Sequence, residues 1–238
     1  MDVLHTLPFI STTITLAFAG AVLGRFLRRR RLHLLFWGLG LLMYASGTFC
    51  EAYLALRWSA IGLRVWYLAG AMLTAAWLAQ GTIYLLVRKV NLAHGLMLVL
   101  VLASVIASGA VFAAPLNASA FRASLPLSSQ YRAIITRSSP IILLTILLNT
   151  YGTIVLVGGA IWSAWLFWRK RVLPQRMIGN IFIAVGALFP AAGGTLVKLG
   201  LGDWLYVSEL LGAILMFAGF WLATQTHLAT AEAKAGAA

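Results

Sequence analysis

Long apolar segments are the feature that most narrows the folds open to this chain. A helix that crosses a membrane needs about 20 mostly apolar residues. Seven segments meet this requirement, approximately residues 7–27, 34–56, 60–87, 92–114, 141–168, 177–199 and 204–228. We therefore predict an all-α polytopic membrane protein, with a single bundle of seven transmembrane helices over residues 1–228 and a short cytoplasmic tail over residues 229–238.

The overall composition agrees with this class. Of the 238 residues, 62% are hydrophobic and only 10% are charged, which is outside the usual range of soluble globular proteins. In a soluble protein, the formal net charge of +13 would suggest nucleic acid as a partner. In a chain of apolar segments this charge reports membrane topology and anionic lipid instead. We expect contact with the lipid bilayer and no nucleic-acid partner.

The basic residues predict the orientation of the bundle, because cytoplasmic loops carry an excess of Lys and Arg. If the N-terminus is outside and the C-terminus is cytoplasmic, the cytoplasmic side holds Arg25, Arg28, Arg29, Arg30, Arg31, Arg88, Lys89, Arg169, Lys170, Arg171, Arg176 and Lys234. The outer side then holds Arg57, Arg64, Arg122, Arg132, Arg137 and Lys198. The cytoplasmic set is larger and lies close to helix ends, which supports this orientation.

The longest connection, residues 115–140, then lies outside the membrane and contains three arginines and no acid. A short helix over residues 128–137, capped by its first serine, would lay Tyr131, Ile134 and Ile135 on the bilayer surface. Alternatively, this loop is a lid over the mouth of the bundle.

An acid inside an apolar segment is the first place to look for function. A charged side chain near the bilayer centre costs about 2.5 kcal/mol or more, so Glu51 should face protein or water. A rise of about 1.5 Å per residue puts Glu51 and Glu209 both roughly 10 Å outside the midplane, and Arg64 and Lys198 about 15 Å outside it. Two carboxyl groups at one depth beneath two cations indicate a polar site near the outer face.

Three more polar side chains fall at a similar height, namely Tyr44, Tyr67 and Asn149. Together with the acids and cations they predict a chamber that opens outward and binds a ligand. Paired charges inside membranes also have structural roles. Two separate ion pairs that fix helix packing are therefore the alternative.

Proline and glycine mark two further places in the apolar segments. The sixth segment contains Pro190, Gly193 and Gly194, which predict a kink or an unwound stretch because proline lacks a backbone donor. Such breaks line binding sites in transporters, although a kink without a ligand is the plainer interpretation. In the first segment, Gly20 and Gly24 have the GxxxG spacing, which serves either a homodimer or packing within the chain.

Several cofactor chemistries find no support in the residues. His33, His94 and His227 fall at cytoplasmic helix ends and His5 lies outside, so no two histidines face each other at mid-membrane as a haem would prefer. The seventh segment contains no lysine, so we expect no retinal Schiff base. The sequence also lacks HExxH, GxxxxGK and GxSxG. We predict no metal site and name no catalytic residue.

Two stretches in the first three segments resemble a known family. They are residues 37–51 (WGLGLLMYASGTFCE) and residues 64–86 (RVWYLAGAMLTAAWLAQGTIYLL). With the seven-span, N-out plan they are similar to the membrane-embedded sensory regions at the N-terminus of some bacterial histidine kinases. The resemblance implies a sensory bundle in a prokaryotic plasma membrane. Only a short Ala-rich stretch follows His227, with no kinase domain, so signalling would need a partner protein.

Three functions are compatible with these observations. The first is a sensory or ligand-binding bundle that takes a small or amphipathic ligand from the outer side, near Glu51 and Glu209. The second is a small proton- or ion-coupled transporter that uses the same two acids, although we find no inverted repeat of the kind that many transporters show. The third is a non-catalytic subunit of a larger membrane complex. An intramembrane enzyme ranks last.

Overall fold

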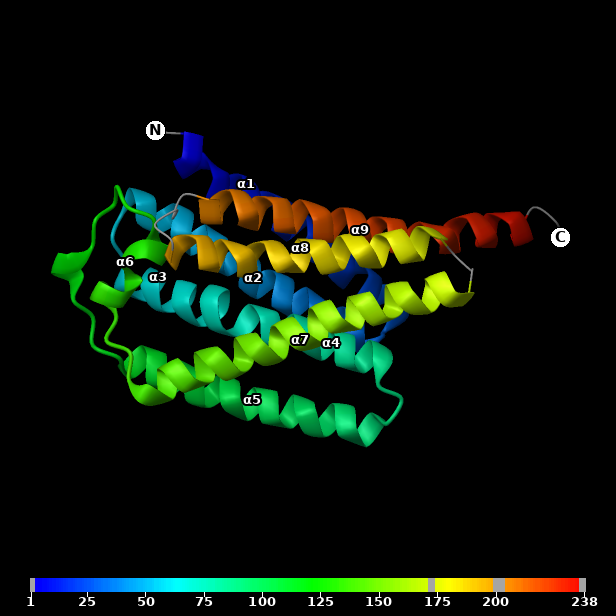
Figure 1. The fold of residues 1–238 in the computed structure, drawn as a ribbon, viewed down its shortest axis with the longest axis horizontal. Coiled ribbons are helices and arrows are strands. Elements are labelled where there is room, and N and C mark those ends of the chain that lie inside the picture. Colours follow the sequence, from blue (N-terminus) through cyan, green and yellow to red (C-terminus); the bar gives the residue numbers. More distant parts are fainter. Residues whose placement is uncertain (1–2, 171–173, 199–203, 236–238) are drawn as a thin grey trace.

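The computed structural model of this chain describes residues 3–170, 174–198 and 204–235, and nearly all regular structure in them is helical. Long helices lie side by side (Figure 1): α1 (Val3–Arg29), α2 (Leu32–Leu56), α5 (Val90–Ala113), α7 (Ser139–Lys170), α8 (Pro174–Lys198) and α9 (Trp204–Ala235). A further long helix is divided into α3 (Ala60–Val65), the π-helix η1 (Trp66–Leu73) and α4 (Thr74–Leu86). The predicted all-α class is confirmed.

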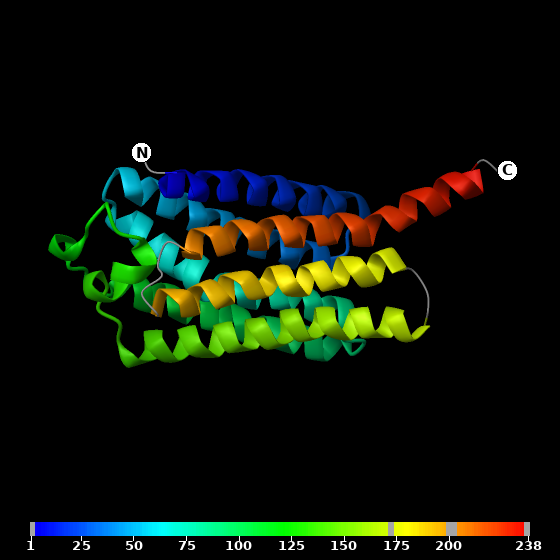
Figure 2. The ribbon, with the colours of Figure 1, turned by 45° about the horizontal axis from the view of Figure 1, so that its top comes forward.

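The lengths and hydropathies of these helices support a multi-pass membrane protein. Among the described residues, six helices are long and apolar enough to cross a membrane: Thr6–Arg29, Leu32–Leu56, Ala60–Leu86, Val90–Ala113, Ser139–Lys170 and Trp204–Thr224. They coincide with six of the seven predicted segments. The remaining segment forms α8, which has 25 residues and lies in the same bundle between α7 and α9 (Figure 2).

The helices pack in a ring that encloses a central space. The α1 helix packs on α2 and α9, α2 packs on η1 and α4, and α4 packs on α7; α7, α8 and α9 then follow one another in contact. The α5 helix lies outside this ring, and only 17% of its most apolar stretch is buried within the protein. Its leucine- and valine-rich surface is therefore available to lipid.

The loop between α5 and α7 folds back over one end of the ring (Figure 1). Leu116 and Ile135 form an antiparallel bridge, and the loop contains the short helices η2 (Ala118–Ala120) and α6 (Leu127–Ile134). Ile134 and Ile135 are 0% and 1% exposed. The prediction that they rest on the bilayer surface is wrong, because they pack into the apolar core beneath the loop.

The helix α8 is not unwound at its proline. It runs as a continuous α-helix through Pro190, Gly193 and Gly194, so the predicted unwound stretch is wrong. Pro190 has no backbone N–H and therefore cannot donate a hydrogen bond to the carbonyl of Gly186, four residues earlier. That carbonyl oxygen instead faces Gly212 of α9, where an added Cβ would lie 2.8 Å from it. The absence of a side chain at Gly212 thus lets α9 pack closely against α8 at the point where α8 lacks this donor.

The irregular backbone lies instead in the third segment. Eight residues, Trp66–Leu73, adopt the π-helix η1, and the hydroxyl of Thr74 donates to the carbonyl of Ala69 at 2.7 Å. At this level Gly47 of α2 and Gly70 of η1 meet backbone to backbone, since a Cβ on Gly47 would lie 2.7 Å from the Cα of Gly70. Segments of π-helix are rare in proteins, and those that occur are often found at functional sites.

The GxxxG pair of α1 is not used for packing within the described part of the chain. A Cβ added at Gly20 or Gly24 would meet no atom within 4 Å. Of the two interpretations of this motif, packing within the chain is therefore not supported, and the homodimer stays a prediction.

Candidate functional site

A cavity of about 660 Å³ lies inside the ring of helices. Its walls come from α2, η1, α4, α7, α8 and α9, and α6 closes one end. We call it the chamber. The polar lining of these walls comprises Tyr44, Thr48, Tyr67, Thr74, Thr145, Asn149, Thr153 and Glu209, and α6 adds Ser128, Ser129, Tyr131 and Arg132. The structure thus brings four of the predicted site residues, Tyr44, Tyr67, Asn149 and Glu209, to one cavity.

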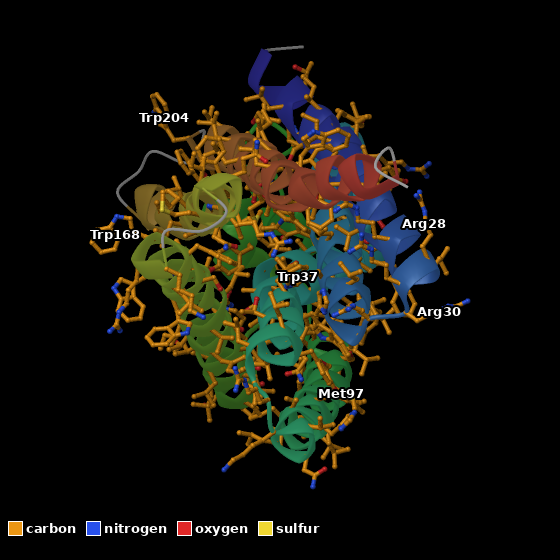
Figure 3. All side chains as sticks on the ribbon, turned by 90° about the vertical axis from the view of Figure 1, so that its right-hand side faces the viewer. Arg28, Arg30, Trp37, Met97, Trp168 and Trp204 are labelled. Carbon is orange, nitrogen blue, oxygen red and sulfur yellow. The ribbon has the colours of Figure 1, made fainter. Side chains whose placement is uncertain are left out.

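The other end of the bundle is closed by apolar packing. Figure 3 looks at that end, where Trp37 lies near the middle and Arg28 and Arg30 lie at the edge. Leu78 and Met216 line the chamber and belong to an apolar cluster against which Trp37 packs. The chamber therefore extends from the α6 end toward the middle of the bundle.

The helix α6 covers the mouth of the chamber as a lid. Tyr131 of α6 places its ring centroid 5.7 Å from that of Trp66 and 5.8 Å from that of Tyr67. The guanidinium of Arg137 lies 5.2 Å from the Tyr131 ring. Arg132 lines the chamber, and its hydrogen bond to the Tyr131 hydroxyl raises the pKa of its guanidinium. Of the two interpretations of this loop, the structure favours the lid.

Replacing Tyr131 with alanine should loosen the lid. Each aromatic pair contributes about 0.5–1.5 kcal/mol beyond the area that it buries, and Tyr131→Ala removes two such pairs. We expect faster trypsin cleavage at the arginines of residues 115–140 in the folded protein, together with a fall of at least about 2 °C in its unfolding temperature. Leu125→Ala, which truncates a lid side chain that is 52% exposed, is the control. Equal cleavage rates in the two variants would show that Tyr131 does not hold the lid.

The middle of the wall is fixed by hydrogen bonds between η1 and α7. The hydroxyls of Tyr67 and Thr145 lie 3.1 Å apart. The side-chain nitrogen of Asn149 donates to the carbonyls of Ala71 and Thr145, both at 2.9 Å. Because Asn149 donates to a π-helix carbonyl, it also stabilises the irregular backbone.

The two acids meet at the back of the chamber. The Tyr44 hydroxyl of α2 donates to the main-chain carbonyl of Glu209 on α9 at 2.8 Å. Glu51 lies behind this wall and is 3% exposed. Its carboxyl group is close enough to that of Glu209 to interact electrostatically, but the geometry is not that of a standard hydrogen bond. Both oxygens of Glu51 and Oε2 of Glu209 lack a hydrogen-bond partner among the described residues.

The predicted cations do not pair with these acids within the described residues. Nη2 of Arg64 donates instead to the carbonyl of Ala114 at 2.8 Å, at the start of the lid loop, and Arg64 is not part of the chamber lining. Lys198 ends α8, and its side chain lies outside the described part. The predicted placement of Arg64 above the acids is therefore wrong. The basic residue that does reach the lining is Arg132.

Sequence reasoning missed the hydroxyls of α1 that approach the same region. Ser11, Thr12 and Thr15 are all buried, and the Thr12 and Thr48 hydroxyls lie 2.9 Å apart. Their spacing of three and four residues puts them on one helix face. This spacing in the sequence is the signal that could have identified these hydroxyls.

Within the described residues, no group of three or more His, Cys, Asp or Glu side chains is placed to hold a metal ion. No protein-family model, no curated protein and no solved structure matches this chain. The chamber and the acids behind it are therefore the features of this molecule that bear on its function.

Proposed function

We propose that this chain is a seven-helix ligand-binding or sensory protein of a prokaryotic plasma membrane, with its N-terminus outside and its C-terminus in the cytoplasm. The observation that carries the proposal is the chamber. Its volume of about 660 Å³ falls in the range of about 300–1,000 Å³ that is usual for small-molecule sites. Its mixture of aromatic, apolar and a few polar side chains suits a small or amphipathic ligand.

The lid end of the chamber is the proposed side of entry. Arg28 and Arg30 lie at the opposite end of the bundle (Figure 3), in the basic run that the distribution of charges assigns to the cytoplasm. The lid then faces outward. A ligand that enters past Tyr131 and Arg132 would meet Tyr67 and Asn149 first and Glu209 deeper inside.

The helix α9 offers a route from the chamber to a partner protein. Glu209 lies near its beginning, and its other end projects past the neighbouring helices (Figure 1). A ligand shifts a conformational equilibrium only by as much as its affinity differs between the two states. A ligand that contacts Glu209 in only one of the two states would bind that state more tightly. Glu209 lies on α9, the helix whose other end projects from the bundle.

Filling the chamber should abolish binding without unfolding the protein. As probes we would use tryptamine and its neutral analogue tryptophol, which combine an aromatic body with one polar group. Binding to the protein in nanodiscs is measured against empty nanodiscs. Thr153→Trp, which fills the chamber, is expected to weaken saturable binding by about tenfold or more. Ile154→Trp adds the same ring one residue along, at a side chain that is 66% exposed, and should bind as the unmodified chain does.

The proposal fails if neither probe binds saturably, or if Thr153→Trp and Ile154→Trp bind alike. Transport is the second candidate, because the buried Glu51–Glu209 pair is of the kind that ion-coupled carriers use. Uptake of the bound probe into proteoliposomes distinguishes the two functions. Flux that is lost in Glu209→Gln favours transport, and binding without flux favours sensing.

A further inference from the structure

Buried oxygen atoms without a partner gather where α1, α2 and α9 meet. They are Oγ of Ser11, Oγ1 of Thr15, both carboxyl oxygens of Glu51 and Oε2 of Glu209, and none has a hydrogen-bond partner among the described residues. Ser11, Thr15 and Glu51 are 1%, 0% and 3% exposed. Buried polar groups nearly always have hydrogen-bond partners, so this group of unpaired oxygens needs a physical explanation.

Three of these residues, Ser11, Glu51 and Glu209, interact with one tyrosine side chain. The side chain of Tyr44 interacts with the carboxyl groups of Glu209 and Glu51 and with the hydroxyl of Ser11. Thr15 follows Ser11 by four residues and so lies on the same face of α1. The charges that act on the two acids within the described residues are those of each other, with no basic side chain beside them.

A chamber ligand does not reach the two oxygens of Glu51. Glu51 is not part of the chamber lining, and its two oxygens are inaccessible to solvent. Two carboxyl groups that face each other at low dielectric are stable only if a positive charge, either a shared proton or a bound cation, lies between them. Only something small enough to sit among the oxygens can supply it.

The donor set indicates which cation fits. All of the groups are oxygens, which are the ligands of hard cations rather than of zinc or copper. Calcium takes 6–8 oxygen ligands, with several carboxylates among them. Here the two acids and the hydroxyls of Ser11 and Tyr44 are the available donors. Two carboxyl groups this close do not both ionise readily, and with one of them protonated the set carries a single negative charge and suits a cation of a single charge.

We propose that the carboxyl groups of Glu51 and Glu209, with the hydroxyls of Ser11 and Tyr44, bind a dehydrated sodium ion between α1, α2 and α9. The site adjoins the chamber, because Tyr44 and Glu209 line both, and it does not require that the chamber bind anything. Because Glu209 also lines the chamber, the ion and a chamber ligand would share one wall. Sodium occupancy would then influence binding in the chamber.

Sodium should stabilise the purified protein in the absence of any other ligand. We would compare thermal unfolding in sodium chloride with that in choline chloride at equal ionic strength, and measure binding of radioactive sodium directly. A rise of about 5 °C is expected when sodium is about 100-fold above its Kd. Glu51→Gln and Glu209→Gln should remove both the rise and the binding.

A milder pair of variants keeps the test valid if the acid variants fold poorly. Ser11→Ala should weaken sodium binding by about tenfold. Thr13→Ala removes an exposed hydroxyl two residues along α1, one that donates to the carbonyl of Phe9, and should leave sodium binding unchanged. Equal unfolding temperatures in sodium and choline would overturn the proposal. So would a response to pH without sodium binding, because the acids would then share a proton. Neither result bears on binding of tryptamine in the chamber.

Discussion

In sodium-free buffer, Glu51→Gln is expected to unfold at a temperature about 5 °C higher than the unmodified chain. A buried charge without compensation destabilises a protein by about 3–5 kcal/mol, and part of this is relieved when the acids take up a proton. For a chain of this size, 1 kcal/mol corresponds to about 2–4 °C. Glutamine keeps the shape of the side chain and removes its charge beside Glu209.

The same change should bring no benefit when sodium is present. The unmodified protein then holds its ion and recovers the stability that the acid pair loses without it, so the two unfolding temperatures should converge. Tyr53→Phe is the control, because Tyr53 lies two residues along α2 with its side chain 38% exposed. A Glu51→Gln variant that unfolds at a lower temperature in both buffers would show that the carboxylate stabilises the fold. The inference that the acids are uncompensated would then be wrong.

Hydropathy predicted the positions of the helices, because burial in lipid demands long apolar segments whatever the fold inside the bundle is. The fixed helical rise likewise predicted the common height of Glu51 and Glu209. The structure places these two carboxyl groups in interaction. The height of a residue along its helix depends only on the local sequence, and it could therefore be predicted.

The direction in which a side chain points around its helix axis could not be predicted from the sequence in the same way. The guanidinium of Arg64 turns to the carbonyl of Ala114, and that choice depends on where the lid loop passes. Ile134 and Ile135 are apolar as an interfacial helix requires, yet they are buried in the protein. An apolar face alone does not distinguish a protein surface from a lipid surface.

The position of irregular backbone could not be predicted from the local sequence either. Local rules for proline predicted a kink or an unwound stretch at Pro190, and α8 is a continuous helix there, packed closely against Gly212 of α9. The π-helix of residues 66–73 carries no proline. It lies at the contact of Gly47 with Gly70, two residues from different helices, and such a contact is not read from either segment alone.

Replacing Gly47 with valine should be the most destabilising single change described for this protein. A Cβ at Gly47 would lie 2.7 Å from the Cα of Gly70 and 3.3 Å from its nitrogen. The obstacle is backbone, so no side chain can rotate away, and α2 must separate from η1. Overpacking typically costs about 1–3 kcal/mol and occasionally more. We expect a fall of about 6–10 °C in the unfolding temperature and a loss of saturable tryptamine binding, since both glycines line the chamber.

Gly20→Val is the matched control for this prediction. It adds the same branched side chain to a membrane helix at a glycine whose added Cβ would meet no atom within 4 Å. It should therefore unfold within about 2 °C of the unmodified chain. Similar losses in Gly47→Val and Gly20→Val would point to the general effect of valine in a helix. A loss confined to Gly47→Val would instead mean that the close approach of α2 and η1, and with it the shape of the chamber wall, depends on having no side chain at that contact.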